Sequence, residues 1–168
     1  RAKRRIQYLP SRQSIFEKIG IQKQIDEAFS RQVWLKCGGY LVIDETEAMI
    51  TVDVNTGRNR GSKDVDKMLM ETNVEAAEEV ARQLRLRNIG GLVVVDFIDM
   101  RHRRDQQAVY RAMKERLKRD KAKTQVLQIS SIGLMEMTRQ RLNESLRDSL
   151  LEPCPYCEGR GRVKTPMT

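Results

Sequence analysis

Leu92-Val-Val-Val-Asp96-Phe-Ile-Asp99 is a continuous apolar run that ends in acidic residues. A run of this kind is typical of a strand that is covered on both faces in a sheet flanked by helices. Asn88-Ile-Gly-Gly91 precedes it and is expected to end a helix, because glycine adopts the left-handed conformation without strain. This stretch therefore predicts a buried strand in an α/β fold.

The segments before this strand predict a hairpin and two helical regions. Tyr40–Ile43 and Ala48–Val54 are β-rich runs joined by the polar turn Asp44-Glu-Thr-Glu47, which is typical of a hairpin. A long amphipathic helix is expected from a cap at Ser62 or Asp64 to about Arg87. A shorter helical region spans 15–29 and is interrupted near Gly20.

The segments after it predict a helix over about 105–119, a strand over 124–129 and a helix over 134–147. The expected order is ββαβαβα, which indicates an α/β sandwich, a mixed β-sheet with flanking helices. We expect one folded domain with appendages, since the chain has 168 residues.

Composition narrows the class of partner. Lys and Arg number 32 against 23 for Asp and Glu, a net charge of +9, which favours a polyanion such as nucleic acid. No apolar run approaches the ~18 residues of a membrane span, so no span is expected. Three cysteines do not form a disulfide framework and indicate a reducing cytoplasm. The chain does not begin with Met, and we interpret it as a segment of a longer protein.

Two acids at strand ends form the candidate catalytic site. Side chains alternate along a strand, so Asp53 and Asn55 share the face opposite to that of the apolar residues between them. Asp96 ends the apolar run, and ligands of α/β sheets bind beyond such ends. If the two strands are neighbours, Asp53 and Asp96 can hold one Mg²⁺, which prefers carboxylate oxygens, water and phosphate. The alternative is that both acids only end their strands; Asp44 and Asp99 are expected to be structural.

Cys154-Pro-Tyr-Cys157-Glu-Gly-Arg-Gly161 has the spacing of half a zinc site. A structural zinc takes four ligands, so a second copy of the chain would supply the other pair across a dimer interface. A redox C-x-x-C motif and an empty knuckle remain alternatives. The basic residues with predicted RNA contacts are Arg58, Arg60, Lys123, Arg139 and Arg141.

Three segments together resemble the ribonuclease E/G family. They are Gly38–Ala48 running into Val52-Asp-Val-Asn55, then Ala81–Met100, and finally Cys154-Pro-Tyr-Cys-Glu-Gly-Arg-Gly161 followed by Val163-Lys164. The resemblance implies magnesium-dependent hydrolysis of single-stranded RNA that leaves 5′-phosphate and 3′-hydroxyl ends, in RNA processing and decay. It also implies that Asp53 and Asp96 bind Mg²⁺, that Asn55 is catalytic, and that Lys123 lies near the RNA backbone.

For the chain as a whole, the resemblance implies three parts. These are the end of a ribonuclease-H-like subdomain at 1–30, a deoxyribonuclease-I-like catalytic subdomain at 31–150 and a zinc-link segment at 151–168. Cys154 and Cys157 would join two subunits through one shared Zn²⁺, in a dimer of dimers, in a cytoplasmic protein of bacterial or plastid type. The family's amino-terminal RNA-binding domain and its final dimerisation domain have no counterpart here, so we expect weak or no turnover.

Two other functions compete with the endoribonuclease core. One is a non-catalytic RNA-binding or oligomerisation module. The other is a chaperone-like zinc module, against which the single copy of the cysteine motif argues.

Overall fold

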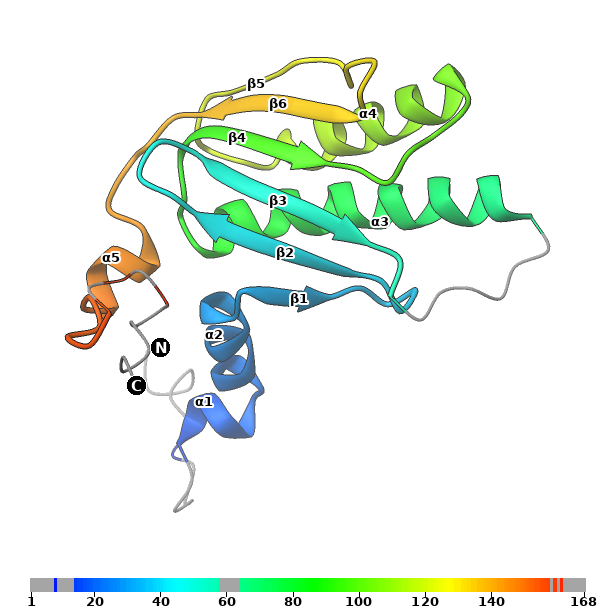
Figure 1. Cartoon of the computed structure of the whole chain (residues 1–168). Coiled ribbons are helices and arrows are strands. Elements are labelled where there is room, and N and C mark those ends of the chain that lie inside the picture. Colours follow the sequence, from blue (N-terminus) through cyan, green and yellow to red (C-terminus); the bar gives the residue numbers. More distant parts are fainter. Residues whose placement is uncertain (1–7, 9–13, 58–63, 158, 160, 162–168) are drawn as a thin grey trace, which may run out of the picture.

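The computed structural model describes Tyr8, residues 14–57 and 64–157, Gly159 and Gly161. Within these residues the elements follow one another as in Figure 1: α1 Ile15–Lys18, α2 Ile21–Phe29, β1 Gln32–Trp34, β2 Tyr40–Glu45, β3 Ile50–Asn55, α3 Val65–Leu86, β4 Gly91–Asp96, α4 Arg103–Leu117, β5 Thr124–Val126, β6 Leu134–Arg139 and α5 Leu146–Leu150.

The strands form one mixed sheet in the order β1-β2-β3-β4-β6-β5. β3 and β4 pair in parallel, and the other pairs are antiparallel. The expected hairpin is confirmed, since Glu45 pairs with Ile50 across the β2–β3 turn. The predicted α/β class with a mixed sheet is therefore confirmed.

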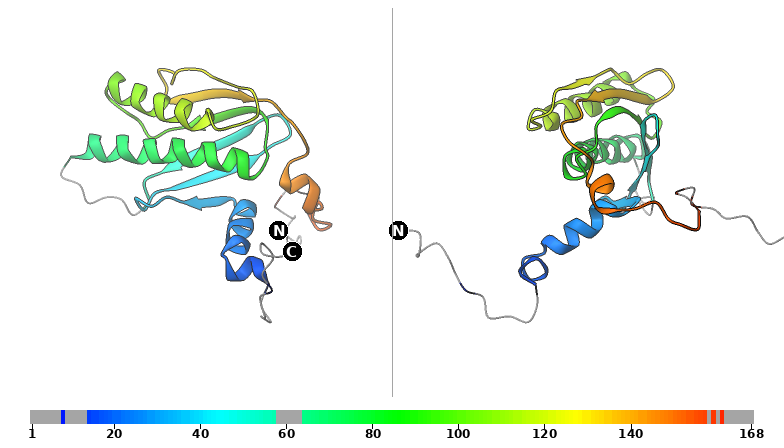
Figure 2. Two further views of the ribbon diagram at one scale, coloured as in Figure 1. Left: turned by 180° about the vertical axis from the view of Figure 1, so that it is seen from behind. Right: turned by 90° about the vertical axis from the view of Figure 1, so that its left-hand side faces the viewer.

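The long helices α3 and α4 lie side by side against one face of the sheet (Figure 2). Alternate strand residues supply the core on that face: Leu41, Ile43, Ile50, Val52, Val54, Val93, Val95, Met135 and Met137 are buried. The expectation that β4 is covered on both faces is wrong, because Leu92 is 39% exposed. Val94 is half-buried between its partners Thr51 and Glu136, so neighbouring strands shield it where helices do not.

The helix predicted over 134–147 is also wrong. Leu134–Arg139 is strand β6, and only Leu146–Leu150 is helical at its end. Met135, Met137 and Arg139 are buried, whereas Glu136 and Thr138 between them are exposed, which is the period of two of a strand. The strand expected over 124–129 is confirmed in part, as β5 ends at Val126.

The predicted helix boundaries follow local chemistry. Asp64 caps α3 by accepting a hydrogen bond from the Lys67 N–H at 3.1 Å. Asn88, just beyond the helix, has a φ of 52°, and the chain then enters β4. Gly20, with a φ of 73°, separates α1 from α2 as expected.

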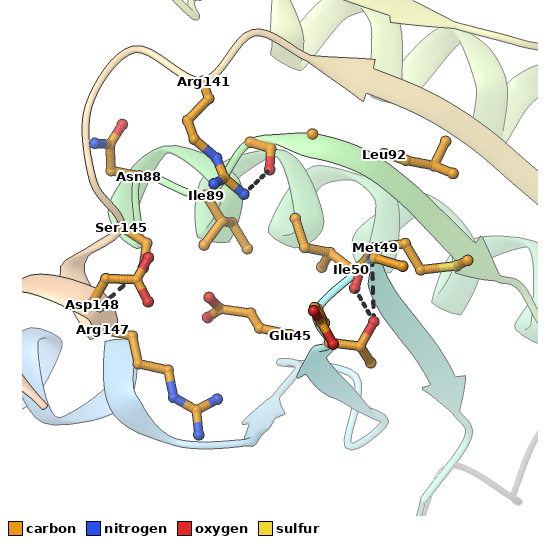
Figure 3. Close-up of a pocket in the computed structure, with 15 residues that line it drawn as sticks. Glu45, Met49, Ile50, Asn88, Ile89, Leu92, Arg141, Ser145, Arg147 and Asp148 are labelled. Atoms are coloured by element: carbon orange, nitrogen blue, oxygen red, sulfur yellow. Dashed lines mark hydrogen bonds between the residues drawn. The ribbon is translucent and has the colours of Figure 1, made fainter. Parts of the chain in front are cut away.

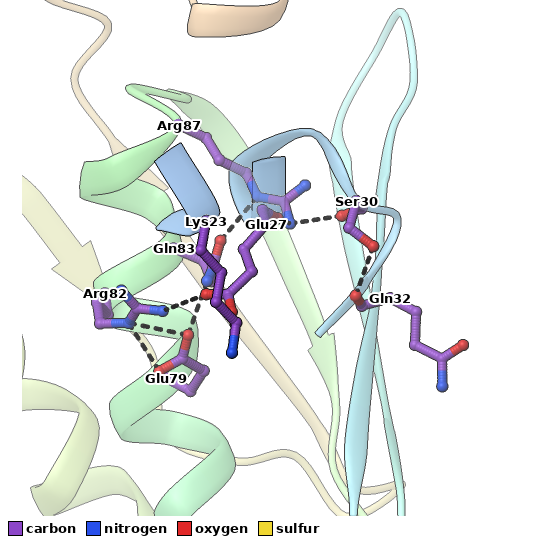
Figure 4. Close-up of polar contacts among 8 residues, drawn as sticks. All are labelled: Lys23, Glu27, Ser30, Gln32, Glu79, Arg82, Gln83 and Arg87. Carbon is purple, nitrogen blue, oxygen red and sulfur yellow. Dashed lines mark hydrogen bonds and ion pairs between the residues drawn. The ribbon is translucent and has the colours of Figure 1, made fainter. Parts of the chain in front are cut away.

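A buried arginine attaches α2 to α3 (Figure 4). The Arg87 guanidinium donates to the Ser30 carbonyl at 2.7 Å and to Gln83 Oε1 at 2.9 Å. Gln83 in turn donates to Glu79 Oε1 at 2.7 Å. These bonds fix the chain where it enters the sheet. Among the described residues, no helix is both long and apolar enough to cross a membrane.

Candidate active site

Asp53 and Asp96 lie side by side at the carboxyl ends of β3 and β4. They are register partners in the parallel pair, so their side chains project from the same face of the sheet. Neighbouring strands are about 4.8 Å apart. Both side chains are exposed, on the face of the sheet opposite to that of the buried residues Val52 and Val95. The structure thus brings together the two acids that the sequence placed 43 positions apart.

Asn55 and Asp99 complete this group. The Asn55 amide donates to Asp53 Oδ2 at 2.7 Å, which fixes the orientation of that carboxylate. All four residues line an open hollow of about 350 Å³. Asp99 therefore belongs to the site's surroundings, although the sequence favoured a purely structural role for it.

Asp44, by contrast, lies away from the hollow. The Arg31 guanidinium donates to its two oxygens at 2.5 and 2.7 Å. These hydrogen bonds lower the pKa of the Asp44 carboxyl below its usual range. This pairing with Arg31 fits the structural role expected for Asp44.

Asn73 on α3 holds the backbone that follows β4. Its side chain is fully buried, donates to the Ile98 carbonyl at 2.7 Å and accepts from the Ile98 N–H at 3.0 Å. This pair of bonds fixes the segment between Asp96 and Asp99. Sequence reasoning missed Asn73, although its spacing from Leu69 and Ala76 places it on the inward face of the helix.

The turn between β1 and β2 supports the end of β3. The Glu75 carboxylate accepts from the N–H groups of Lys36 and Cys37 at 2.6 and 3.1 Å. A Cβ on Gly39 would lie 2.7 Å from the Asn55 carbonyl oxygen, so only glycine allows this close approach. Cys37 is half-buried, and burial raises the pKa of its thiol.

The predicted RNA contacts do not gather around the carboxylates. Lys123 and Arg141 are exposed, but both lie close to Arg139, the last residue of β6. Asp96 pairs with Leu134, at the opposite end of that strand. Five residues of strand span roughly 17 Å. Arg58 and Arg60 lie outside the described residues.

Arg139 is buried and serves the fold. Its guanidinium donates to the two carboxylate oxygens of Asp120 at 2.7 and 3.1 Å and to the Ile89 carbonyl at 2.7 Å. Its side chain is 4% exposed, so we withdraw it from the predicted RNA contacts. Burial opposes ionisation of Asp120, but the hydrogen bonds from Arg139 and the Ala122 N–H outweigh it and lower the Asp120 pKa.

A cavity of about 300 Å³ lies near the end of the sheet where β4 begins and β6 ends (Figure 3). Glu45, Arg141, Arg147 and Asp148 bring both signs of charge to its lining. Burial raises the pKa of the Glu45 carboxyl, while Arg147, Arg87 and Arg141 act in the opposite direction and Asp148 reinforces the rise.

Cys154 and Cys157 lie on a tight turn and carry free thiols. The backbone N–H groups of Cys157 and Tyr156 lower the pKa of the Cys154 thiol, and the Gly161 N–H donates to Cys157 Sγ at 3.3 Å. Backbone donors directed at the Cys154 sulfur favour its thiolate, the form that binds metal. Nowhere in the described part of the chain do three or more His, Cys, Asp or Glu residues gather as one metal site.

Residues 1–142 match the sequence model of the Ribonuclease E/G family. The chain is 45% identical to Ribonuclease G of Escherichia coli (strain K12) over 164 residues, 98% of this chain and 34% of that protein. It is 44% identical to Ribonuclease G of Haemophilus influenzae over 156 residues, 93% of this chain and 32% of that one. Ribonuclease E of Escherichia coli (strain K12) is 47% identical over 150 residues, 89% of this chain and 14% of its own length. The chain thus spans about a third of the Ribonuclease G relatives.

Proposed function

Because this chain belongs to the ribonuclease E/G family, we propose that Asp53, Asn55 and Asp96 form the catalytic centre of an endoribonuclease. The observation that carries the proposal is the register pairing of the two aspartates at the carboxyl edge of the sheet. Its substrate would be single-stranded RNA, hydrolysed to 5′-phosphate and 3′-hydroxyl ends during RNA processing and decay.

The donor set fits a magnesium ion. Mg²⁺ takes one or two carboxylates and fills its remaining positions with water and substrate phosphate, and Asp53 and Asp96 offer that number. The ion would supply Lewis acidity toward the phosphodiester and lower the pKa of water at the site. Asn55 holds the Asp53 carboxylate through its 2.7 Å hydrogen bond, so it positions one ligand. Asp99 adds negative charge to the same hollow and strengthens its attraction for a cation.

The RNA strand would extend from this site along the surface of the protein, which carries a net positive charge. The net charge of +9 favours a polyanion, and Lys123 and Arg141 are exposed where a strand of several nucleotides can contact them. Arg58 and Arg60 follow β3 in sequence and remain candidates for contacts close to the scissile phosphate.

We also propose that Cys154 and Cys157 bind one half of a structural zinc shared by two chains. Two thiols with backbone donors provide half of a tetrahedral set. The resulting homodimer would pair again into a dimer of dimers. The free thiols fit a reducing cytoplasm.

The catalytic proposal is tested by Asp53→Asn and Asp96→Asn in a full-length protein that contains this segment. Each substitution keeps the side-chain shape and removes one negative ligand, so RNA cleavage at fixed Mg²⁺ should fall at least about 100-fold, and Mn²⁺ binding measured by water-proton relaxation should weaken. Asp44→Asn is the matched control, since that acid lies outside the hollow and pairs with Arg31.

Undiminished cleavage by both aspartate variants would remove the catalytic proposal. RNA binding without cleavage by the unsubstituted protein would instead support the second candidate, a non-catalytic RNA-binding or oligomerisation module.

A further inference from the structure

A second polar cavity, of about 260 Å³, lies between α4 and the connection from β5 to β6. We call it the amide cavity, because three glutamines contribute to its lining. Its main polar residues are Arg103, Gln106, Gln107, Tyr110, Gln128 and Ser130. None of these residues belongs to the catalytic hollow.

The amide cavity lies at the same edge of the sheet as the candidate active site. β6 begins at Leu134, which pairs with Asp96, so the connection before β6 reaches the carboxyl end of β4. A Cβ on Gly133 in that connection would lie 3.5 Å from Asp99 Oδ1. Ser130 is tied to the start of the strand, since its N–H donates to the Leu134 carbonyl at 2.8 Å. Figure 1 shows the start of α4 and the start of β6 at the end of the sheet where β3 and β4 finish.

The side chains of the cavity have the chemistry that recognises a base. A glutamine amide presents a donor and an acceptor side by side, which matches the N6 and N7 positions of adenine. Within the described residues, the Gln107 and Gln128 side chains form no hydrogen bond, whereas the Gln106 amide is anchored to the Met100 carbonyl at 3.3 Å. Two of the three amides are thus available to a ligand.

Tyr110 and Arg103 supply the other two parts of a nucleotide site. Tyr110 is half-buried, and Lys114 Nζ lies 5.4 Å from its ring centroid. A tyrosine ring in the wall of a cavity offers an unpaired base a face to stack on. Arg103 is exposed and forms no ion pair with any residue that the structure describes, so its charge is available to a phosphate.

We propose that the amide cavity binds a single unpaired base of the RNA strand, with adenine preferred, beside the scissile phosphodiester. Its volume lies just below the range of about 300–1,000 Å³ of cavities for larger ligands, as expected for one base. The inference rests on the RNA substrate proposed above and adds to it a determinant of where the strand is cut.

Binding is tested first, without reference to cleavage. The chain is titrated with each of the four nucleoside 5′-monophosphates while NMR follows the side-chain amides of Gln107 and Gln128. Adenosine monophosphate should shift both amides at about one tenth of the concentration that the other three need. Gln107→Ala should abolish this difference, and Gln125→Ala, a matched glutamine on β5 outside the cavity, should leave it intact. Equal response to all four nucleotides would overturn the proposal.

Cleavage selectivity is tested second, in a full-length protein that contains this segment. RNA oligonucleotides that differ at one position next to the cut are compared by kcat/KM. Gln107→Ala should reduce the preference for adenine about 10-fold, whereas Gln125→Ala should retain it. Tyr110→Ala should lower kcat/KM for every base at that position, because any base can stack on the ring, and Tyr110→Phe should keep it. An unchanged preference in Gln107→Ala would overturn the inference. If the unsubstituted protein cleaves no RNA but the amides still respond to adenosine monophosphate, the proposed function fails and the base site stands.

Discussion

Two Asp–Arg pairs of this protein have the same chemistry and very different surroundings. Asp120 and Arg139 have side chains 3% and 4% exposed, whereas Asp44 and Arg31 are 40% and 71% exposed. A buried charge that loses its partner costs far more than an exposed one, because no water replaces the lost interaction. Burial therefore decides which pair the fold depends on.

Asp120→Asn should lower the free energy of unfolding by about 3–5 kcal/mol, since it leaves the buried Arg139 guanidinium without its counter-charge. Asp44→Asn should cost about 1 kcal/mol or less. The folded state lowers the Asp120 pKa, so this stabilisation is present above the unfolded pKa of about 3.9 and is lost as pH falls toward the folded value. Urea unfolding at neutral pH measures both variants, and equal losses would contradict the prediction.

The contribution of Glu45 to the free energy of unfolding changes with pH in the opposite direction to that of Asp120. Burial raises its pKa in the folded state, so folding favours the protonated acid and ionisation of Glu45 opposes folding as pH rises. Glu45→Gln should therefore be more stable than the unsubstituted protein at pH 7. The difference should vanish below the unfolded pKa of about 4.3, where both side chains are neutral. Thermal unfolding across this pH range tests the prediction, and a difference independent of pH would refute it.

At the scale of elements, α3 determines where β4 ends, through Asn73. Asn73→Ala would leave the N–H and carbonyl of Ile98 without their partners, at a cost of at least about 2 kcal/mol. It should also weaken Mn²⁺ binding, because the segment from Asp96 to Asp99 loses its anchor. Asn143→Ala, at an exposed position, is the control. Full stability and full Mn²⁺ affinity in Asn73→Ala would show that the two Asn73–Ile98 hydrogen bonds are dispensable.

The elements predicted correctly are those with a local pattern. The hairpin, the long capped helix α3 and the apolar strand β4 each follow from residues close in sequence. The sequence does not predict β1, because three residues are too short for a periodic pattern, and it predicts a helix where β6 lies, although the buried residues of β6 alternate. The side-by-side position of Asp53 and Asp96 was predicted on the condition that their strands are neighbours, which the structure satisfies.

Contacts between distant elements could not be predicted in this way. The Arg139–Asp120 pair and the Asn73–Ile98 bonds depend on which helix packs beside which strand. The amide cavity arises in the same manner, from α4 and the β5–β6 connection.

At the scale of the whole molecule, the zinc proposal makes a stoichiometric prediction. The purified chain should contain about half a zinc atom per copy, and Cys154→Ser should lose both the metal and the dimer, because four thiolates from two chains complete one tetrahedral site. Cys37→Ser should keep both, since Cys37 lies by the β1–β2 turn. Elemental analysis with light scattering measures this, and one zinc per monomer would contradict it.

The 168-residue chain by itself should cleave RNA weakly or not at all. RNA affinity grows with the number of phosphate contacts, and this chain spans only 34% of the length of the Ribonuclease G that it resembles. Side-by-side assays with that Ribonuclease G on one RNA measure the difference, and comparable rates would contradict the expectation.

The β3–β4 pair, the only parallel pair in the described sheet, links ion binding to the folded state. A short turn connects β2 to β3, whereas the connection from β3 to β4 contains the whole of α3. Closing that long loop carries an entropic cost that the hairpin avoids. The two aspartates are therefore neighbours only once this loop is closed, and the unfolded chain holds no preformed ion site. Any divalent ion held between them binds the native state alone, so its concentration would itself raise the protein's melting temperature.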